Sequence, residues 1–276
     1  MQNRSKRVAA IHDLSCFGRS SLTVVMPLFA KMGIQVCPLP TALLSTHGAY
    51  ENGTYKDLTN EMISIIKHWE ELKLEFDVIY SGFLGSGDQI DIVLDFIEKF
   101  SSNKPLIVVD PVMGDEGEVY SIIDSGITSK MNKLVKVANI ITPNTTEAFV
   151  LLNKEYKPTM DIPEAKAILK ELSELGPDIV VLTSIHNIDS NSRYTGIYDK
   201  INSKFYFDSC EYIPVDYPGT GDAFTSVFIG AILNGSSLEK ALSYSLKFIE
   251  SALKFTQKLD SDPNDGINIE MPQIIW

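Results

Sequence analysis

The sequence Pro218-Gly219-Thr220-Gly221-Asp222 places an acid directly after two glycines that flank a threonine. An apolar run to Leu233 follows, which predicts a helix that begins at this turn. Glycines let main-chain N–H groups converge without side chains in the way, and a helix N-terminus adds unpaired N–H groups and partial positive charge. Such a turn suits a phosphate or a developing oxyanion. We therefore expect Gly219, Thr220 and Gly221 to form an anion hole.

Asp222 is the residue of this turn that could act as a base. A carboxylate in an anion site is electrostatically unfavourable unless it has a chemical role there. The role that fits is to accept a proton from a hydroxyl group that attacks phosphorus. The alternative is structural, because aspartate is also common in the first turn of a helix.

Two further motifs follow predicted strands. Asp110 directly follows the most strand-like run, Leu106–Val109, and precedes a loop that contains Gly114. An acid at that place suits a metal ion or a phosphate, although acids in turns before proline are common. Asn144 and Glu147 lie three residues apart where a strand leads into a helix, so they share one helix face. They could serve a metal site, or they could form a capping box that only stabilises the helix.

Strand-like and helix-like segments alternate along the chain, which predicts an α/β fold with an open, mostly parallel sheet and helices on both faces. No linker, repeat or low-complexity tract interrupts the pattern, so we expect residues 1–276 to form a single domain. The predicted strands are 8–11, 34–36, 76–80, 106–109, 139–142 and 178–182, with a hairpin at 194–198 and 204–207. The predicted helices are 21–32, 57–74, 89–100, 164–175, 221–233 and 237–256.

Polar residues follow several of these strands. Ligands of open α/β sheets bind beyond the carboxyl ends of the strands. The residues expected at that edge are Asp13, Gly82, Asp110, Asn144 and Thr183. The acidic, glycine-bearing segment Met113–Tyr120 is the candidate for a mobile lid.

The composition argues against several classes of protein. A net charge of −12 and a pI near 4.8 disfavour nonspecific nucleic-acid binding, which needs clustered lysine and arginine. Three widely spaced cysteines without a C-x-x-C pair suit a reducing compartment. The apolar run after the polar start is too short for a signal peptide, and no run is long enough to span a membrane. We expect a cytoplasmic protein with neither nucleic acid nor membrane as a partner.

Motifs that are missing narrow the class of enzyme further. The chain has no G-x-x-x-x-G-K-[ST] phosphate loop and no G-x-G-x-x-G fingerprint after its first strand, which disfavours P-loop kinases and Rossmann dehydrogenases. It also lacks the G-x-S-x-G elbow that carries the nucleophile in α/β-hydrolases, which disfavours that class of enzyme. No pair among its four histidines has metal-ligand spacing, which argues against a catalytic zinc.

Taken together, the motifs resemble the ribokinase-like superfamily, and the N-terminal half is similar to the pyridoxal/pyridoxamine kinases, above all to their bacterial pyridoxamine kinase branch. The resemblance covers nearly the whole chain in order. It is carried by the motifs at 110–114, 144–147 and 219–222 and by the stretches 8–18, 38–47 and 81–86. It implies phosphoryl transfer from ATP to the 5′-hydroxyl of a vitamin B6 vitamer: pyridoxal, pyridoxamine or pyridoxine. It also implies Mg²⁺, a homodimer and a fold without the separate β-lid domain of the sugar kinases.

The resemblance further implies roles for the residues around the phosphates. Asp222 would be the general base, and the main-chain N–H groups of Gly219–Asp222 would form the anion hole. Asn144 and Glu147 would place the Mg²⁺ ion and its water molecules. Asp110 would face the metal and the phosphates.

It implies two binding regions as well. The nucleotide would lie along Thr183 and Ser184. The pyridine pocket would be lined by Asp13, Thr41, His47 and Phe83. Many pyridoxal kinases have a serine and a longer glycine-containing loop where this chain has Asp13-Leu14-Ser15-Cys16, and an acid there could prefer a cationic amine or a protonated ring nitrogen.

Several alternatives stay open from the sequence. The preferred vitamer and the need for a monovalent cation are undetermined. A hydroxymethylpyrimidine kinase of thiamin synthesis would use the same chemistry on another ring. A non-catalytic, B6-binding regulatory relative is a third reading, although such a protein has no reason to keep a carboxylate facing phosphate.

Overall fold

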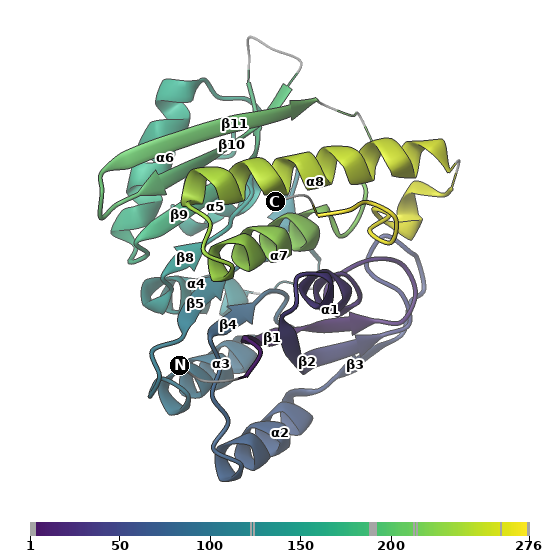
Figure 1. The fold of residues 1–276 in the computed structure, drawn as a ribbon, viewed down its shortest axis with the longest axis vertical. Coiled ribbons are helices and arrows are strands. Elements are labelled where there is room, and N and C mark those ends of the chain that lie inside the picture. Colours follow the sequence, from purple (N-terminus) through teal and green to yellow (C-terminus); the bar gives the residue numbers. More distant parts are fainter. Residues whose placement is uncertain are drawn as a thin grey trace.

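The structure is a computed structural model and describes residues 4–274 except 122, 124, 188–191, 212, 214 and 260. Within these residues nine strands form one sheet, in the order β11-β10-β9-β8-β5-β4-β1-β2-β3, and β6 pairs with β7 in a separate ribbon (Figure 1). The strands are β1 (Arg7–Ser15), β2 (Gln35–Leu44), β3 (Tyr55–Asp57), β4 (Val78–Ser81), β5 (Leu106–Val109), β6 (Gly114–Asp115), β7 (Glu118–Val119), β8 (Ile140–Ile141), β9 (Ile179–His186), β10 (Ser192–Asp199) and β11 (Lys204–Glu211).

The central strands of the sheet are parallel. β1 pairs in parallel with β2 and β4, and the parallel pairing continues through β5 and β8 to β9. The antiparallel strands lie toward the edges, with β3 at one side and β10 and β11 at the other. The predicted α/β class with a mostly parallel sheet is therefore confirmed.

Helices cover both faces of the sheet, as predicted. Apolar residues of α2–α6 pack in one core, and those of α1, α7 and α8 pack in the core on the opposite face (Figure 1). In the described residues, no separate β-lid domain accompanies these layers. The helices are α1 (Leu22–Lys31), α2 (Thr59–Glu71), α3 (Gly87–Lys99), α4 (Ser125–Val137), α5 (Thr145–Leu151), α6 (Ile162–Glu174), α7 (Thr220–Leu233), α8 (Leu238–Lys258) and the short 3₁₀ helix η1 (Pro263–Asp265).

The strand register aligns the carboxyl ends of the parallel strands. Ile11 of β1 lies beside Ser81 of β4, and the row continues through Val109, Ile141 and Val180. The residues that follow this row are those expected at the edge: Asp13, Gly82, Asp110, Asn144 and Thr183. The parallel topology thus brings side chains from five separate parts of the sequence to one edge.

The helices begin in two different ways. Asn144 and Asp161 cap α5 and α6 through capping boxes with Glu147 and Glu164. By contrast, α7 begins at Gly219, which has a left-handed backbone (φ 81°), and no side chain caps it. α1 begins at Ser21, also without a side-chain cap and with a positive φ of 51°. The uncapped starts of α1 and α7 meet at the candidate site, where the N–H of Ser21 binds Asp222.

Several predicted boundaries were wrong. β1 runs on to Ser15, past the predicted end at Ile11, because it continues to pair with a β2 that reaches Leu44. β9 runs past Thr183 to His186, because β10 pairs with it through a register shift. Helix α4 had not been predicted, and neither had the short strand β3. The proposed lid segment Met113–Tyr120 contains the β6–β7 ribbon.

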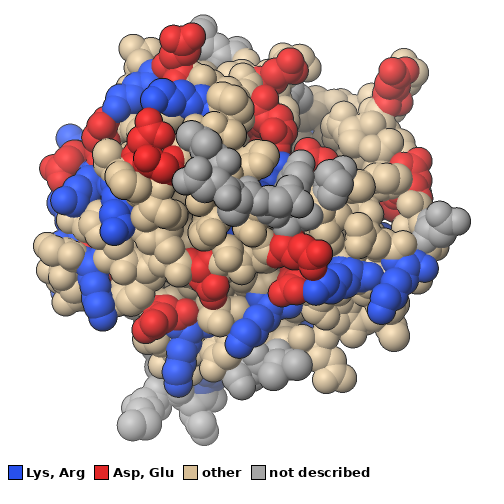
Figure 2. Space-filling model, turned by 90° about the horizontal axis from the view of Figure 1, so that it is seen from above, with Lys and Arg blue, Asp and Glu red and all other residues tan. Residues whose placement is uncertain are grey.

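Charged side chains of both signs are interspersed on the face seen in Figure 2. The three cysteines are free thiols. Among the described helices, none is both long enough and apolar enough to cross a lipid bilayer.

Candidate active site

Asp222 lies in the first turn of α7, at the third helical position. Its Oδ2 accepts a hydrogen bond of 2.7 Å from the main-chain N–H of Ser21, the residue that begins α1. Only 14% of its side chain is exposed. Burial, which the Ser21 N–H opposes and the nearby Asp13 reinforces, raises the pKa of Asp222 to about 7. The carboxyl group can therefore exchange a proton near neutral pH.

The turn before Asp222 combines a tightly packed glycine with an open one. A Cβ atom on Gly219 would lie 2.4 Å from the carbonyl oxygen of Arg19, and its φ of +81° is left-handed. At Gly221 an added Cβ would meet nothing within 4 Å. The first N–H groups of a helix have no partner within it, so the open space at Gly221 leaves room for an anion above them. The geometry is compatible with the predicted anion hole.

Ser21 connects two acids of the site. Its main-chain N–H binds Asp222, and its hydroxyl donates a short hydrogen bond to Oδ1 of Asp13. The hydroxyl of Ser15 donates to the other oxygen of Asp13 at 3.1 Å. Asp13 is buried, and burial raises its pKa, while the two serine hydroxyls oppose that shift. A left-handed serine is thus the link between the predicted pyridine pocket and the predicted base.

His12 of β1 lies next to Asp222 on the interior side and is completely buried. Its Nδ1 is 3.8 Å from Oδ1 of Asp222, and neither ring nitrogen has a hydrogen-bond partner. Burial lowers the pKa of His12 to about 3, so the imidazole is neutral and the contact is not an ion pair. The ring packs edge-on against Tyr80, with the ring centroids 4.4 Å apart.

Four largely buried carboxyl groups form a row along this edge. The row consists of Asp13, Asp222, Asp110 and Glu147. Burial is the main cause of the raised pKa of each. In addition, Asp222 raises the pKa of Asp110, to about 8 in all, and Asp110 raises that of Glu147. In the described part of the chain, no lysine or arginine forms an ion pair with any of the four. Uncompensated buried carboxyls favour either protons or a bound cation.

Asn144 and Glu147 form a complete capping box at the start of α5. The main-chain N–H of Asn144 donates to Oε2 of Glu147 at 2.8 Å, and that of Met113 donates to Oε1 at 3.2 Å. The Asn144 amide in turn donates to the carbonyl oxygen of Gly114 at 2.8 Å. The structural alternative raised from the sequence is therefore present. A role for the pair in placing a metal would have to act through water molecules.

The carboxyl groups of this edge can be compared with the oxygen ligands that Mg²⁺ prefers. In the described residues, no group of three or more histidine, cysteine, aspartate or glutamate side chains could hold a metal by itself. Mg²⁺ does not require such a cage, since it commonly binds one or two carboxylates and completes its shell with water and substrate phosphates. Asp110 is an oxygen donor whose raised pKa a cation would lower. The residues present therefore fit Mg²⁺ held by Asp110, with Glu147 close by.

Thr183 and Ser184 lie within β9, near the end of β8. The main-chain N–H of Thr183 donates to the carbonyl oxygen of Pro143 at 2.9 Å. Ser184 has a left-handed backbone (φ 57°), next to the register shift between β9 and β10. The bulge gives this strand a local kink where a nucleotide was expected.

Thr41 and Phe83 join two strand ends on the pyridine side. Thr41 is fully buried, and its hydroxyl donates to the carbonyl oxygen of Phe83 at 3.0 Å. The amide of Gln89 donates to the carbonyl oxygen of Thr41 at 2.9 Å. These bonds fix the backbone on either side of the predicted pocket.

His47 contacts a segment that is distant in sequence. Its Nε2 lies 2.8 Å from the carbonyl oxygen of Asn264, and its Nδ1 accepts from the N–H of Ala49 at 3.3 Å. With Nδ1 accepting, Nε2 carries the proton and donates. A Cβ atom on Gly18 would lie 2.4 Å from the ring, so the chain passes very close to it. Tyr50 packs against His47 with ring centroids 5.2 Å apart.

Three residues that contact the site, Ser21, His12 and Tyr50, could not be predicted from the sequence. Ser21 stands at the start of the predicted helix 21–32, and no local pattern reveals that its N–H binds Asp222. His12 directly follows the predicted strand 8–11, whereas in the structure it lies inside β1. Its place beside Asp222 follows from the position of β1 in the middle of the sheet, between β2 and β4.

Comparisons with known proteins agree with this architecture. The model of the phosphomethylpyrimidine kinase family matches residues 28–266. A protein of Bacteroides thetaiotaomicron, assigned as a phosphomethylpyrimidine kinase and solved in a crystal form with pyridoxal, is 43% identical. The superposition has a TM-score of 0.93 and covers 98% of this chain and 97% of that one.

Pyridoxal kinases are also similar over most of their length. The structure from Lactobacillus plantarum is 28% identical with a TM-score of 0.87, covering 96% of this chain and 94% of that one. The pyridoxal kinase of Arabidopsis thaliana is 29% identical over 85% of this chain and 76% of its own. The chain therefore belongs to the phosphomethylpyrimidine kinase family and, as its motifs predicted, to the ribokinase-like kinases that include the pyridoxal kinases.

Proposed function

We propose that this protein is a kinase that transfers the γ-phosphoryl group of ATP to the 5′-hydroxyl of a vitamin B6 vitamer. Membership of the family, and similarity to pyridoxal kinases over nearly the whole chain, support the kinase reaction and ATP as its co-substrate. The observation that carries the mechanism is the place of Asp222, a carboxyl group with a pKa near neutral at an uncapped helix N-terminus.

Asp222 accepts the proton of the attacking hydroxyl. Its Oδ2 already binds the Ser21 N–H, so Oδ1 is the oxygen left to face the substrate. A positioned base supplies roughly 10²–10⁴-fold of rate acceleration. Because kinases need more than that, alignment of the two substrates and stabilisation of charge on the moving phosphoryl group must supply the rest.

The start of α7 stabilises that charge. Thr220, Gly221 and Asp222 occupy its first three helical positions, where main-chain N–H groups have no partner within the helix. Gly221 keeps the space in front of them open. The turn therefore binds the phosphoryl oxygens while the adjacent carboxylate takes the proton.

Asp110 would hold Mg²⁺, and the capping box of Asn144 and Glu147 would orient its water molecules. When bound, Mg²⁺ supplies positive charge that offsets charge on the phosphates. The nucleotide would lie along Thr183 and Ser184, where the bulge of β9 exposes main-chain groups. A monovalent cation could also bind near this row of carboxyls.

Asp13 defines the vitamer end of the site. It is buried, its two oxygens are held by serine hydroxyls, and no lysine or arginine pairs with it in the described residues. A protonated pyridine nitrogen or a cationic amine would provide the missing positive charge. His47, Thr41 and Phe83 would line the remainder of the pocket.

We propose that the active protein is a cytoplasmic homodimer.

A hydroxymethylpyrimidine kinase is the second candidate, because the family model and the Bacteroides relative both carry the phosphomethylpyrimidine name. The relative's crystal form with pyridoxal favours the vitamer.

The test is a substrate panel with the purified chain. Pyridoxal, pyridoxamine, pyridoxine and hydroxymethylpyrimidine are each supplied with MgATP, and ADP release is measured with the Asp222→Asn variant as the control. We expect release that depends on a vitamer. A higher kcat/KM for the pyrimidine would replace the vitamer as substrate, and ATP consumption that no substrate stimulates would remove the kinase assignment.

A further inference from the structure

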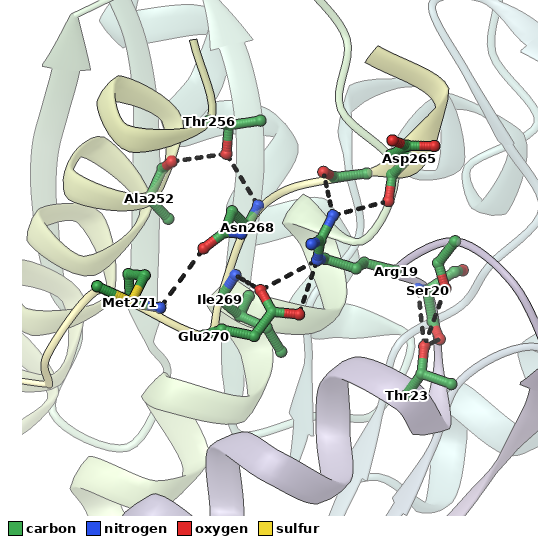
Figure 3. Close-up of polar contacts among 12 residues, drawn as sticks. Arg19, Ser20, Thr23, Ala252, Thr256, Asp265, Asn268, Ile269, Glu270 and Met271 are labelled. Atoms are coloured by element: carbon green, nitrogen blue, oxygen red, sulfur yellow. Dashed lines mark hydrogen bonds and ion pairs between the residues drawn. The ribbon is translucent and has the colours of Figure 1, made fainter. Parts of the chain in front are cut away.

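The chain after α8 turns back across the molecule and reaches the candidate site. Its segment Asp262–Glu270, which we name the C-terminal clasp, contacts several regions that are distant in sequence. The three regions nearest the site are the loop at His47–Tyr50, the residues before α1 and the turn before α7. Lys31, at the other end of α1, is a further contact. Figure 3 shows the side chain of Arg19 held between Asp265 and Glu270 of the clasp.

Arg19 makes the central contacts. Its main-chain N–H donates to the carbonyl oxygen of Asp265 at 3.0 Å. Its Nη1 donates to the same oxygen at 3.2 Å and to that of Gly266 at 3.5 Å. Its Nε donates to the Glu270 carboxylate at 2.9 and 3.1 Å. Because the Glu270 side chain is 57% exposed, the ion pair itself contributes little, and the bonds to the carbonyl oxygens carry the attachment.

Two glycines bring the catalytic turn and the clasp against the backbone of Arg19. A Cβ atom on Gly219 would lie 2.4 Å from its carbonyl oxygen, and one on Gly266 would lie 2.7 Å from it. Both glycines have left-handed backbones, with φ of +81° and +82°. The N–H of Ile267 also donates to the carbonyl oxygen of Pro218 at 3.0 Å, just before the turn. The clasp is therefore bonded directly to the segment that carries Asp222.

The other end of the clasp holds the pyridine-pocket loop. Asn264 accepts from Nε2 of His47, and Asp265 accepts from the hydroxyl of Tyr50 at 2.8 Å. Two residues after Arg19, the N–H of Ser21 binds the Asp222 carboxylate. One short segment thus joins the pocket loop, the start of α1 and the catalytic turn.

We propose that Arg19 is a positioning residue, which through the C-terminal clasp holds the vitamer loop at His47–Tyr50 in register with the turn that carries Asp222. The inference rests on the proposed function for its effect on rate. Since misplacing reacting groups by about 1 Å can cost ~10²-fold in rate, small movements of this attachment matter. The nucleotide strand β9 receives none of the clasp's hydrogen bonds described above.

The test compares Arg19→Gln with Lys31→Gln in the full chain. Lys31 also binds the clasp, through the carbonyl oxygens of Ile269 and Glu270, but from the last turn of α1, at the opposite end of that helix from Ser21. With pyridoxal and MgATP, Arg19→Gln should lower kcat about tenfold or more and raise the KM for pyridoxal, while the KM for ATP stays within about twofold. Lys31→Gln should lower Tm but leave kcat within about twofold.

A second readout does not depend on substrate. Hydrogen–deuterium exchange should become faster in Arg19→Gln both at 45–54 and at 217–222, and it should not do so in Lys31→Gln. Glu270→Gln, which removes the ion pair and keeps the bonds to carbonyl oxygens, should behave like the wild type. If Arg19→Gln does not fold, Arg19→Lys serves instead, because lysine keeps the charge but loses the two-pronged contact.

Equal effects of the Arg19 and Lys31 variants, on rate and on exchange, would overturn the proposal and leave only a general contribution to stability. Wild-type protein that phosphorylates no vitamer would reject the proposed function instead. In that case the exchange measurement still decides whether the clasp holds the two loops together.

Discussion

The helices α5 and α7 begin at the same edge of the sheet, and each has an acid at its third helical position. Glu147 of α5 turns back into a capping box, and both of its oxygens accept main-chain N–H groups. In the part of the chain that the structure describes, Asp222 of α7 accepts one N–H, from Ser21 at the start of α1. The difference lies in the N-cap residue, three positions before each acid. Asn144 has a side chain that completes the box, whereas Gly219 has none, so the acid of α7 stays available for chemistry.

The largest expected effect comes from Asp222→Asn. The amide cannot accept the hydroxyl proton, so kcat should fall about 10²–10⁴-fold. The KM for ATP should change little, because the N–H groups of the turn remain. Steady-state kinetics with pyridoxal and MgATP give the answer. A loss smaller than about tenfold would mean that Asp222 is a first-turn acid like Glu147.

The pH dependence is the second way to test the comparison. Because the pKa of Asp222 is raised to about 7, the group is protonated below that pH and cannot act as a base. We expect kcat/KM to fall about tenfold for each pH unit below 7 and this limb to vanish in Asp222→Asn. A profile that is flat between pH 5 and 7 would contradict the assigned pKa.

The same shift has a consequence for stability. A carboxyl group with a raised pKa in the folded state stabilises the protein below its unfolded value near 3.8, and that contribution is lost as the pH rises through 7. Asp222→Asn should therefore gain stability relative to the wild type between pH 4 and pH 8. Urea unfolding at the two pH values measures the difference, which should be a few kcal/mol at most.

The two glycines of the turn separate folding from catalysis. Gly219→Ala should destabilise the protein by more than about 1 kcal/mol, because the backbone is left-handed and the Arg19 carbonyl lies in the way. Gly221→Ala meets no atom and should leave Tm within a few degrees, yet its methyl group would intrude on the anion site and lower kcat about tenfold. Thermal unfolding and kinetics of both variants test this. Parallel losses of Tm and kcat in Gly221→Ala would argue against an open anion hole.

The smallest expected effect is that of Glu147→Ala. Loss of the capping box should cost about 1 kcal/mol of stability. If Glu147 also orients the water molecules of Mg²⁺, the Mg²⁺ concentration needed for half-maximal rate should rise as well. An unchanged Mg²⁺ titration together with lower stability would restrict Glu147 to its structural role.

Much of the fold could be predicted because its signals are local. Apolar runs, glycine stops and caps located α1, α3, α6, α7 and α8 to within two residues or so. The extensions of β1, β2 and β9 could not be predicted in this way, since they depend on partners elsewhere in the sheet. Helix α4 has a weakly apolar sequence, SGITSKMNKLVKV, and owes its place to packing against α3 and β5.

For the site, too, local features could be predicted, whereas contacts between distant positions could not. The sequence indicated Asp222, Asp110 and Asp13, because each acid follows a strand or opens a helix. It did not indicate that Asp13 and Asp222 share Ser21, or that the residues after α8 return to His47. These contacts join positions about 200 residues apart, which no periodicity or spacing encodes.

The ring of His12 also constrains a neighbouring strand. A Cβ atom on Gly82 would lie 2.2 Å from the imidazole, so the two positions compete for one volume of the interior. Gly82 begins the loop that includes Phe83. Because it has no side chain, the ring of His12 can occupy the space next to Asp222. The sizes of the residues at these two positions should therefore covary among relatives. A family member with alanine or a larger residue at the position of Gly82 should have a residue smaller than histidine at the position of His12.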